Sequence, residues 1–289
     1  MTKDQLPPRL LTRRRALLAG AAAVGAAGTA GLFTTFAGDE PVRRATTPSP
    51  SPAPVAGPQA RTAHKPSSYR LEPLMGYGPP RAAPRRTPVR RAPMLQVSGR
   101  GRRMVLTFDD GPDARYTPHM LDTLREYDIR AMFFVCGEMV AENPDLVARM
   151  ADEGHVVGNH TWSHPLLTRL RRREIREEME RTSDIIEESC GERPAWFRAP
   201  YGAWNRAAFQ IGAELGMDPL AWTVDTLDWT TPGTRTIVDR VENGAAPGVV
   251  VLSHDAGGDR SQSVQALRFY LPRLLDSGYH LTVPVRHYV

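Results

Sequence analysis

The chain is poor in cysteine, with only Cys136 and Cys190 in 289 residues and no CxxC spacing. Two thiols are too few for an all-cysteine zinc site, so that class of site is excluded on ligand count. Cys136 ends an apolar run, where cysteine usually acts as a small buried hydrophobic residue. A Cys136–Cys190 disulfide stays open, because the sequence does not give the distance between the two residues.

Acidic residues are scarce in the first part of the chain. Before residue 104 there are 18 Lys and Arg against 4 Asp and Glu, whereas from residue 104 onward there are 19 against 28. The formal net charge of +5 is therefore the sum of a +14 leader and a −9 remainder. A basic leader suits anionic envelope polymers or lipid headgroups. The acidic part has no basic helix with interleaved aromatic residues, so we expect no nucleic-acid partner.

Residues 1–40 have the pattern of an export signal. Three arginines at residues 13–15 precede a weakly apolar segment rich in Ala and Gly, residues 16–36, as in a twin-arginine signal. That segment is also near the length of a membrane span, so an uncleaved N-terminal anchor is the alternative. Both interpretations place the remainder outside the cytoplasmic membrane, in the medium, in the wall or at the cell surface. Residues 41–103, rich in Pro, Ala and Arg, are expected to form a disordered linker.

Residues 104–289 alternate short apolar runs with amphipathic stretches, which predicts an α/β domain with a mainly parallel sheet. We expect strands at Met104–Phe108, Ala131–Val135, His155–Gly158, Trp196–Arg198, Leu220–Val224, Val249–Ser253 and Leu281–Val285. We expect helices near residues 117–127, 144–153, 172–189, 204–215, 234–243 and 261–276. Seven to eight such strands favour a (β/α) barrel or partial barrel, whose active site lies at the carboxyl ends of the strands.

Local signals mark several helix ends. Thr117-Pro118 and Asn143-Pro144 each place a capping side chain before a proline, which is typical of a helix start. Glycines stand where helices are expected to end, at Gly154, Gly191, Gly216 and Gly278.

Two adjacent aspartates, Asp109 and Asp110, follow the first expected strand and precede Gly111-Pro112. Like charges this close raise each other's pKa, so a cation or a basic partner would relieve the cost. An acidic surface turn is the ordinary alternative. His160 and His164 follow the third strand at a spacing that lets two imidazoles reach one ion. With one aspartate they would form a two-nitrogen, one-oxygen set that suits Zn²⁺ and leaves a position open.

Polar residues also end the later strands. Arg198 could hold a carboxylate in orientation, and the next turn offers the Tyr201 backbone N–H as an oxyanion donor. His254 is either a packed core histidine or a catalytic acid, and a carboxylate such as Asp228 would raise its pKa. Three histidines belong to no such motif and are expected to be structural: His119, His280 and His287.

Five motifs share the order and spacing of one family, and the chain resembles the polysaccharide deacetylases, the NodB-homology domain of carbohydrate esterase family four. The motifs are Thr107–Pro112, His160–His164, Arg198–Tyr201, Asp225–Trp229 and Leu252–His254. The resemblance spans residues 104–289. It implies a distorted (β/α) barrel and metal-dependent removal of acetyl groups from sugars.

The resemblance also implies a role for each motif residue. Asp109 matches the catalytic base, and Arg198 matches the residue that orients this base. The metal ligands are matched by Asp110, His160 and His164. Tyr201 matches the oxyanion donor, His254 matches the general acid and Asp228 matches the residue that tunes this acid, while Trp229 and Leu252 match the walls of the acetyl pocket. Ala199 stands where the family often has Pro, a departure that would loosen the turn without removing a functional group.

The implied activity is hydrolysis of N-acetyl groups on N-acetylglucosamine polysaccharides, either peptidoglycan or chitin-type oligomers, with release of acetate. One divalent metal would be needed, with Zn²⁺ first and Co²⁺, Ni²⁺ or Mn²⁺ as alternatives. An O-acetyl esterase of acetylated xylan would use the same residues, and a non-catalytic wall-binding protein is a further alternative. The polysaccharide substrate is the expected partner, and a membrane would be contacted only through residues 16–36.

Overall fold

The structure is a computed structural model that describes residues 87–98 and 100–284. The predicted export signal and most of the predicted linker lie outside these residues and stay predictions. Within the described part of the chain, no helix has both the length and the apolar character needed to cross a membrane.

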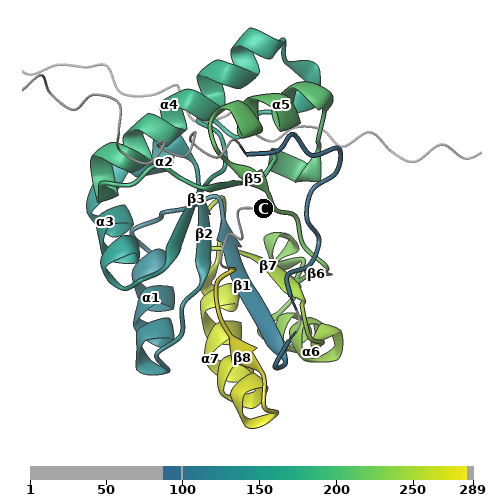
Figure 1. The fold of residues 1–289 in the computed structure, drawn as a ribbon. Coiled ribbons are helices and arrows are strands. Elements are labelled where there is room, and N and C mark those ends of the chain that lie inside the picture. The colour runs from purple at the N-terminus through teal and green to yellow at the C-terminus, as the bar shows by residue number, and fades with distance from the viewer. Residues whose placement is uncertain (1–86, 99, 285–289) are drawn as a thin grey trace, which may run out of the picture. The chain divides into compact units, whose positions relative to one another are not determined.

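Within the described residues, a single sheet of eight short strands forms the centre of the domain, in the order β5-β4-β3-β2-β1-β7-β6, with β8 paired to the start of β1 (Figure 1). The strands are β1 (Arg103–Asp109), β2 (Met132–Val135), β3 (Val156–Asn159), β4 (Trp196–Phe197), β5 (Asp218–Pro219), β6 (Val224–Asp225), β7 (Val250–His254) and β8 (His280–Leu281). All the strand pairings are parallel. Because β5 and β6 are both edges, the barrel is incomplete, which confirms the predicted partial (β/α) barrel.

Helices lie around the outside of the strands (Figure 1). They are α1 (Thr117–Glu126), α2 (Gly137–Glu142), α3 (Pro144–Asp152), α4 (Arg172–Cys190), α5 (Arg206–Glu214), α6 (Thr234–Gly244) and α7 (Ser261–Asp276). Three 3-10 turns follow strand ends or precede helices: η1 (Leu167–Arg169), η2 (Pro200–Gly202) and η3 (Asp228–Thr230). The six predicted helices are confirmed within a few residues. Helix α2 was not predicted, because six residues are too few to show a helical period.

Some local predictions are wrong in detail. Thr117 is the first residue of α1 and not its cap; its hydroxyl accepts a hydrogen bond from the Asp113 N–H at 2.8 Å and donates one to Asp255 Oδ2 at 2.6 Å. The Asn143 side chain makes no cap bond and donates to the carbonyl of Met139. The strand expected at 220–224 is split into β5 and β6, with the chain between them outside the sheet. The four helix-terminal glycines do adopt positive φ angles.

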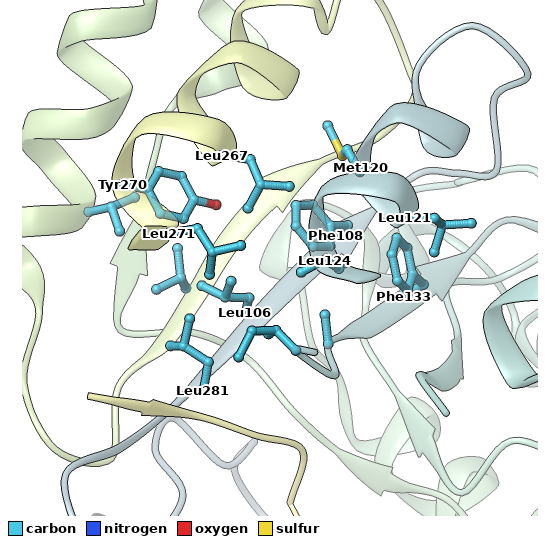
Figure 2. Close-up of a cluster of buried hydrophobic side chains, with 14 of the residues drawn as sticks. Leu106, Phe108, Met120, Leu121, Leu124, Phe133, Leu267, Tyr270, Leu271 and Leu281 are labelled. Atoms are coloured by element: carbon cyan, nitrogen blue, oxygen red, sulfur yellow. The ribbon is translucent and has the colours of Figure 1, made fainter. Parts of the chain in front are cut away.

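The central strand β1 sends alternate side chains to its two faces, as a strand buried on both sides requires. Leu106 and Phe108 face outward and pack with residues of α1 and α7 in the main core (Figure 2). Val105 faces the inside of the barrel, in a second apolar cluster with Phe134 and Val250. Since side chains alternate, Thr107 and Asp109 share this inner face with Val105. The first aspartate of the pair therefore enters the barrel interior.

Residues 87–98, here called the N-terminal strap, lie against the open side of the barrel. Met94 forms a bridge with Leu220 beside β5, and Gln96 forms one with Val249 beside β7. Met94 and Val97 also pack against the inner apolar cluster. The strap falls within residues 41–103, predicted as linker, so this end of that segment belongs to the domain. Because the segment is rich in Pro and Arg, its composition predicted disorder and gave no sign that Met94 and Val97 pack against the domain.

The two cysteines are both free. Cys136 is buried, as expected for a small hydrophobic residue, whereas Cys190 ends α4. The disulfide that the sequence left open is therefore not formed.

Candidate active site

Asp109 and Arg198 form a buried ion pair at the carboxyl ends of β1 and β4. Arg198 Nη1 donates to Asp109 Oδ1 at 2.6 Å and to Thr107 Oγ1 at 2.8 Å. The other guanidinium nitrogens are used as well, because Nε donates to the carbonyl of Leu220 and Nη2 to that of Ala221, each at 3.0 Å. A guanidinium held at every nitrogen cannot turn away. The predicted orientation of Asp109 by Arg198 is thus present in the geometry.

Burial is the main influence on the pKa of Asp109. Burial raises the pKa of Asp109 above its ordinary value, although the neighbouring Arg198 charge and hydrogen bond oppose the rise. A carboxylate with a raised pKa is a stronger base than a free one.

Asp110, His160 and His164 meet at the same end of the sheet. One ligand atom of each lies within 4.8 Å of the others. Asp110 Oδ1 is 3.2 Å from His164 Nε2 and 3.6 Å from His160 Nε2. The backbone at Asp110 has a φ of 76°, which turns this residue away from the direction of β1. The two adjacent aspartates therefore differ in their partners. Asp109 Oδ1 accepts from Arg198 and its Oδ2 lies 3.6 Å from His160 Nε2, whereas Asp110 Oδ1 lies near both histidines.

The chemistry of this cluster fits a divalent cation. His160 Nδ1 lies 2.8 Å from the carbonyl oxygen of Arg198, which can only accept, so Nδ1 carries the hydrogen and Nε2 keeps its lone pair. Burial, with the charge of His164 as a further cause, lowers the pKa of His160 to about 3, so its ring is neutral. Asp110 Oδ1 is buried and accepts no hydrogen bond. Lone pairs that face one another in this way would be stabilised by a positive ion between them.

His254 and Asp228 form a second linked pair, on β7 and η3. Asp228 Oδ1 is 2.6 Å from His254 Nδ1, and Asp228 Oδ2 accepts from the His254 backbone N–H at 2.9 Å and from Ser263 Oγ at 2.6 Å. Burial alone would lower the pKa of His254, but the hydrogen bond and charge of Asp228 outweigh it and raise the pKa to about 9. The register pairs His254 directly with Asp109 of β1. A proton donor and a proton acceptor therefore stand side by side.

The remaining predicted site residues lie at the same strand ends. The Tyr201 ring makes an edge contact with the His164 ring, with centroids 4.6 Å apart, and is 66% exposed. Trp229 in η3 is 56% exposed, whereas Leu252 is buried in β7, two residues before His254. Exposed aromatic rings beside a polar centre offer surfaces on which a sugar can stack. Of the three histidines predicted to be structural, His119 and His280 lie in α1 and β8, away from these motifs, and His287 is outside the described residues.

Asp255 is a site residue that the sequence analysis missed. It is fully buried, its N–H donates to the carbonyl of Asp109 at 3.1 Å, and burial raises its pKa to about 7. Its Oδ1 has no hydrogen-bond partner. The signal was its position directly after His254, at the carboxyl end of β7, a strand that begins with three apolar residues.

Residue 111 must be glycine because the Asp255 side chain packs closely against it. A Cβ at residue 111 would lie 2.1 Å from Asp255 Oδ2, well inside contact distance. We expect Gly111→Ala to lower the free energy of unfolding by about 1–3 kcal/mol, the usual cost of overpacking. Thermal melting of the purified variant measures this, and Gly111→Ala combined with Asp255→Ala should recover part of the loss. An unchanged melting temperature for the single variant would contradict the close packing.

Comparison with known proteins identifies the family of this chain. Residues 96–220 match the family model described as polysaccharide deacetylase. The chain is 37% identical over 208 residues to a chitooligosaccharide deacetylase of Rhizobium leguminosarum bv. trifolii, covering 68% of this chain and 97% of the relative. A solved peptidoglycan N-acetylglucosamine deacetylase is similar with a TM-score of 0.64 and 34% identity, covering 67% of this chain and 94% of that one.

A further solved structure qualifies what family membership implies. It is a CE4 family pseudoenzyme from Bacillus anthracis, similar with a TM-score of 0.62 and 30% identity over 66% of each chain. Fold alone therefore does not decide activity, and the residues of the site must. In this chain the Asp109–Arg198 pair, the cluster of Asp110, His160 and His164, and the His254–Asp228 pair are all present at the same end of the sheet. The chain belongs to the polysaccharide deacetylase family, the CE4 carbohydrate esterases.

Proposed function

We propose that this protein is a divalent-metal-dependent hydrolase that removes N-acetyl groups from N-acetylglucosamine-containing polysaccharide. The observation that carries the proposal is the arrangement at the ends of β1 and β7. The cation-ready cluster of Asp110, His160 and His164 lies beside Asp109, which can accept a proton, and His254, which can donate one.

The metal would be held by Asp110, His160 and His164. When bound, such an ion polarises a carbonyl and lowers the pKa of a water molecule to about 7. The neutral His160 ring and an Asp110 oxygen that accepts no hydrogen bond are the forms that bind a cation. Zn²⁺ suits two nitrogens and one oxygen best, with Co²⁺, Ni²⁺ and Mn²⁺ as alternatives. Metal analysis of the purified protein identifies the ion.

The proton transfers follow from the two buried pairs. Asp109 accepts a proton from the attacking water as the new C–O bond forms at the acetyl carbonyl. His254 donates a proton to the leaving nitrogen as the C–N bond breaks, so the products are acetate and a free amine. Its Nδ1 is engaged by Asp228, which leaves Nε2 for this donation. The Tyr201 backbone N–H would stabilise the oxyanion, and Trp229 and Leu252 would flank the acetyl methyl group.

The substrate class is supported by the names of the relatives, which specify chitooligosaccharides and peptidoglycan. Peptidoglycan is the first candidate, because the predicted export signal and linker would deliver the domain to the cell envelope. Localisation outside the cytoplasmic membrane is part of this proposal. Cell fractionation of the full-length protein tests it.

Acetate release tests the function. We expect the full-length protein with Zn²⁺ or Co²⁺ to release acetate from peptidoglycan or chitin oligomers, and a chelator to abolish the reaction until metal is restored. Release from acetylated xylan alone would favour the O-acetyl esterase instead. No release from any of the three substrates with metal present would support a non-catalytic wall-binding protein and contradict the proposal.

A further inference from the structure

The loop between the two histidine ligands, residues 161–163, begins at and is followed by a residue with an energetically unfavourable backbone conformation. Thr161 has a φ of 70° and His164 has a φ of 55°, and neither is glycine. Side-chain-bearing residues are disfavoured in this left-handed region. Two such residues so close together persist only if contacts from outside the loop hold them. This loop, here called the ligand loop, sets the separation of the His160 and His164 imidazoles.

Contacts from α2 hold one side of the ligand loop. The N–H groups of Gly137 and Glu138 donate to the carbonyls of Thr161 and Trp162 at 3.0 and 3.1 Å. These bonds use the carbonyl oxygens of the loop. The Thr161 N–H donates to Asn159 Oδ1 at 2.9 Å, which leaves the N–H groups of Trp162 and Ser163 in need of acceptors.

Glu178, on α4, supplies the acceptor for both of these N–H groups. Its Oε2 accepts from the backbone N–H groups of Trp162 and Ser163, each at 2.8 Å, and its Oε1 accepts from Ser163 Oγ at 2.8 Å. One carboxylate therefore takes three hydrogen bonds from two consecutive residues between the ligands. The Arg181 guanidinium, also on α4, lies 3.4 Å from the centre of the Trp162 ring and closes over the same loop.

Neighbouring glutamates of α4 behave differently. Glu177 pairs with Arg173 at 3.7 Å on the exposed side of its own helix, and Glu174 pairs with Arg171. Glu178 instead bonds across to the ligand loop. The difference between adjacent glutamates gives a matched control within one helix turn.

We propose that Glu178 is a positioning residue for the metal centre: by binding the ligand loop it fixes His160 and His164 at the spacing that one ion requires. This rests on the proposed function, in which these histidines and Asp110 hold the metal. Groups that orient ligands without touching the metal commonly contribute about tenfold to a hundredfold in affinity. The contribution of Glu178 comes from its reach to the loop N–H groups and not from its charge.

Three substitutions at residue 178 separate reach from charge. Glu178→Gln loses the charge but keeps the reach, because its carbonyl oxygen can accept from both N–H groups and its amide can donate to Ser163 Oγ. Glu178→Asp keeps the charge but is one methylene shorter, so it loses the reach. Glu178→Ala loses both. Glu177→Ala is the control, because that side chain makes no contact with the ligand loop.

The measurement is the Zn²⁺ dissociation constant of the full chain, from competition with a chromophoric chelator at fixed pH and salt. We expect Glu178→Ala and Glu178→Asp to weaken Zn²⁺ binding by about tenfold or more, and Glu178→Gln and Glu177→Ala to bind like the wild type. Thermal melting of the chelator-treated proteins reports on folding separately. At saturating Zn²⁺, acetate release by Glu178→Ala should recover.

Two results would overturn the inference. One is wild-type Zn²⁺ affinity in both Glu178→Ala and Glu178→Asp, even if their melting temperatures fall, because the role would then be structural only. The other is weak binding by Glu178→Gln with normal binding by Glu178→Asp, because charge would then be the cause. If Glu178→Ala does not fold, the Asp and Gln variants decide between these results. A wild-type protein that binds no Zn²⁺ would instead refute the proposed metal centre.

Discussion

Asp109→Asn is expected to reduce acetate release by a factor on the order of 10²–10⁴, the usual contribution of a general base, while metal binding stays near the wild-type level. Asparagine has the same shape, and its side-chain oxygen can still accept the bond from Arg198 Nη1. It cannot accept a proton from water. The metal ligands are untouched, because the cation site is built on Asp110 and the two histidines.

The measurement pairs the turnover rate with the metal content of the same preparation. Asp122→Asn is the matched control, since Asp122 is a half-exposed aspartate paired with Arg149 on the outer surface and should leave both quantities unchanged. If Asp109→Asn lost the metal, the division of labour between the two adjacent aspartates would be refuted. A variant with both metal and full turnover would show that another group is the base.

We expect Asp228→Asn to lower the pH at which activity is lost on the basic side of the pH profile. His254 must be protonated to donate, so activity is retained below its pKa and lost as pH rises through it. With Asp228 in place, that pKa is raised to about 9. Without the Asp228 charge and hydrogen bond, burial pulls the pKa of His254 downward and only the charges of Asp110 and Asp109 oppose it, so the loss of activity should begin at lower pH than in the wild type. We expect a fall in rate at pH 8 of about tenfold or more, since each pKa unit is a factor of ten.

The test is the pH dependence of kcat/KM for the wild type and for two variants. Ser263→Ala removes one hydrogen bond from Asp228 Oδ2 but leaves the carboxylate, so it should move the basic limb less than Asp228→Asn does. A basic limb that stays in place in Asp228→Asn would mean that His254 is not the group titrating there. His254→Ala should remove the limb together with most of the activity.

The strand ends were predictable because the sequence pattern and the chemistry agree there. Apolar runs end at Asp109, His160 and His254, and in a parallel sheet these ends lie at one edge, so the site could be assembled without coordinates. The family resemblance then supplied a role for each residue. The roles themselves stay predictions until the variants are measured, since the structure shows only that the residues meet.

Other parts could not be predicted, each for a physical reason. Helix α2 is too short to show a period, and the strap carries its docking residues in a segment whose composition indicates disorder. The direction of the Asp109 pKa shift also depends on the coordinates, because burial raises the pKa while the Arg198 charge and hydrogen bond lower it, and burial has the larger effect. Glu178 was invisible, because nothing in a run of four glutamates within seven residues shows which one turns inward.

The N-terminal strap also supports Arg198, so it belongs to the smallest part of the chain that can keep this side chain in place. Ala221, whose carbonyl accepts from Arg198 Nη2, donates its own N–H to the carbonyl of Met94 at 2.7 Å. A truncated protein beginning at residue 104, where the sequence places the start of the domain, would keep all five motifs and still lose this support. The catalytic unit is therefore longer than its motifs, and a shortened version for expression should retain the chain from residue 87.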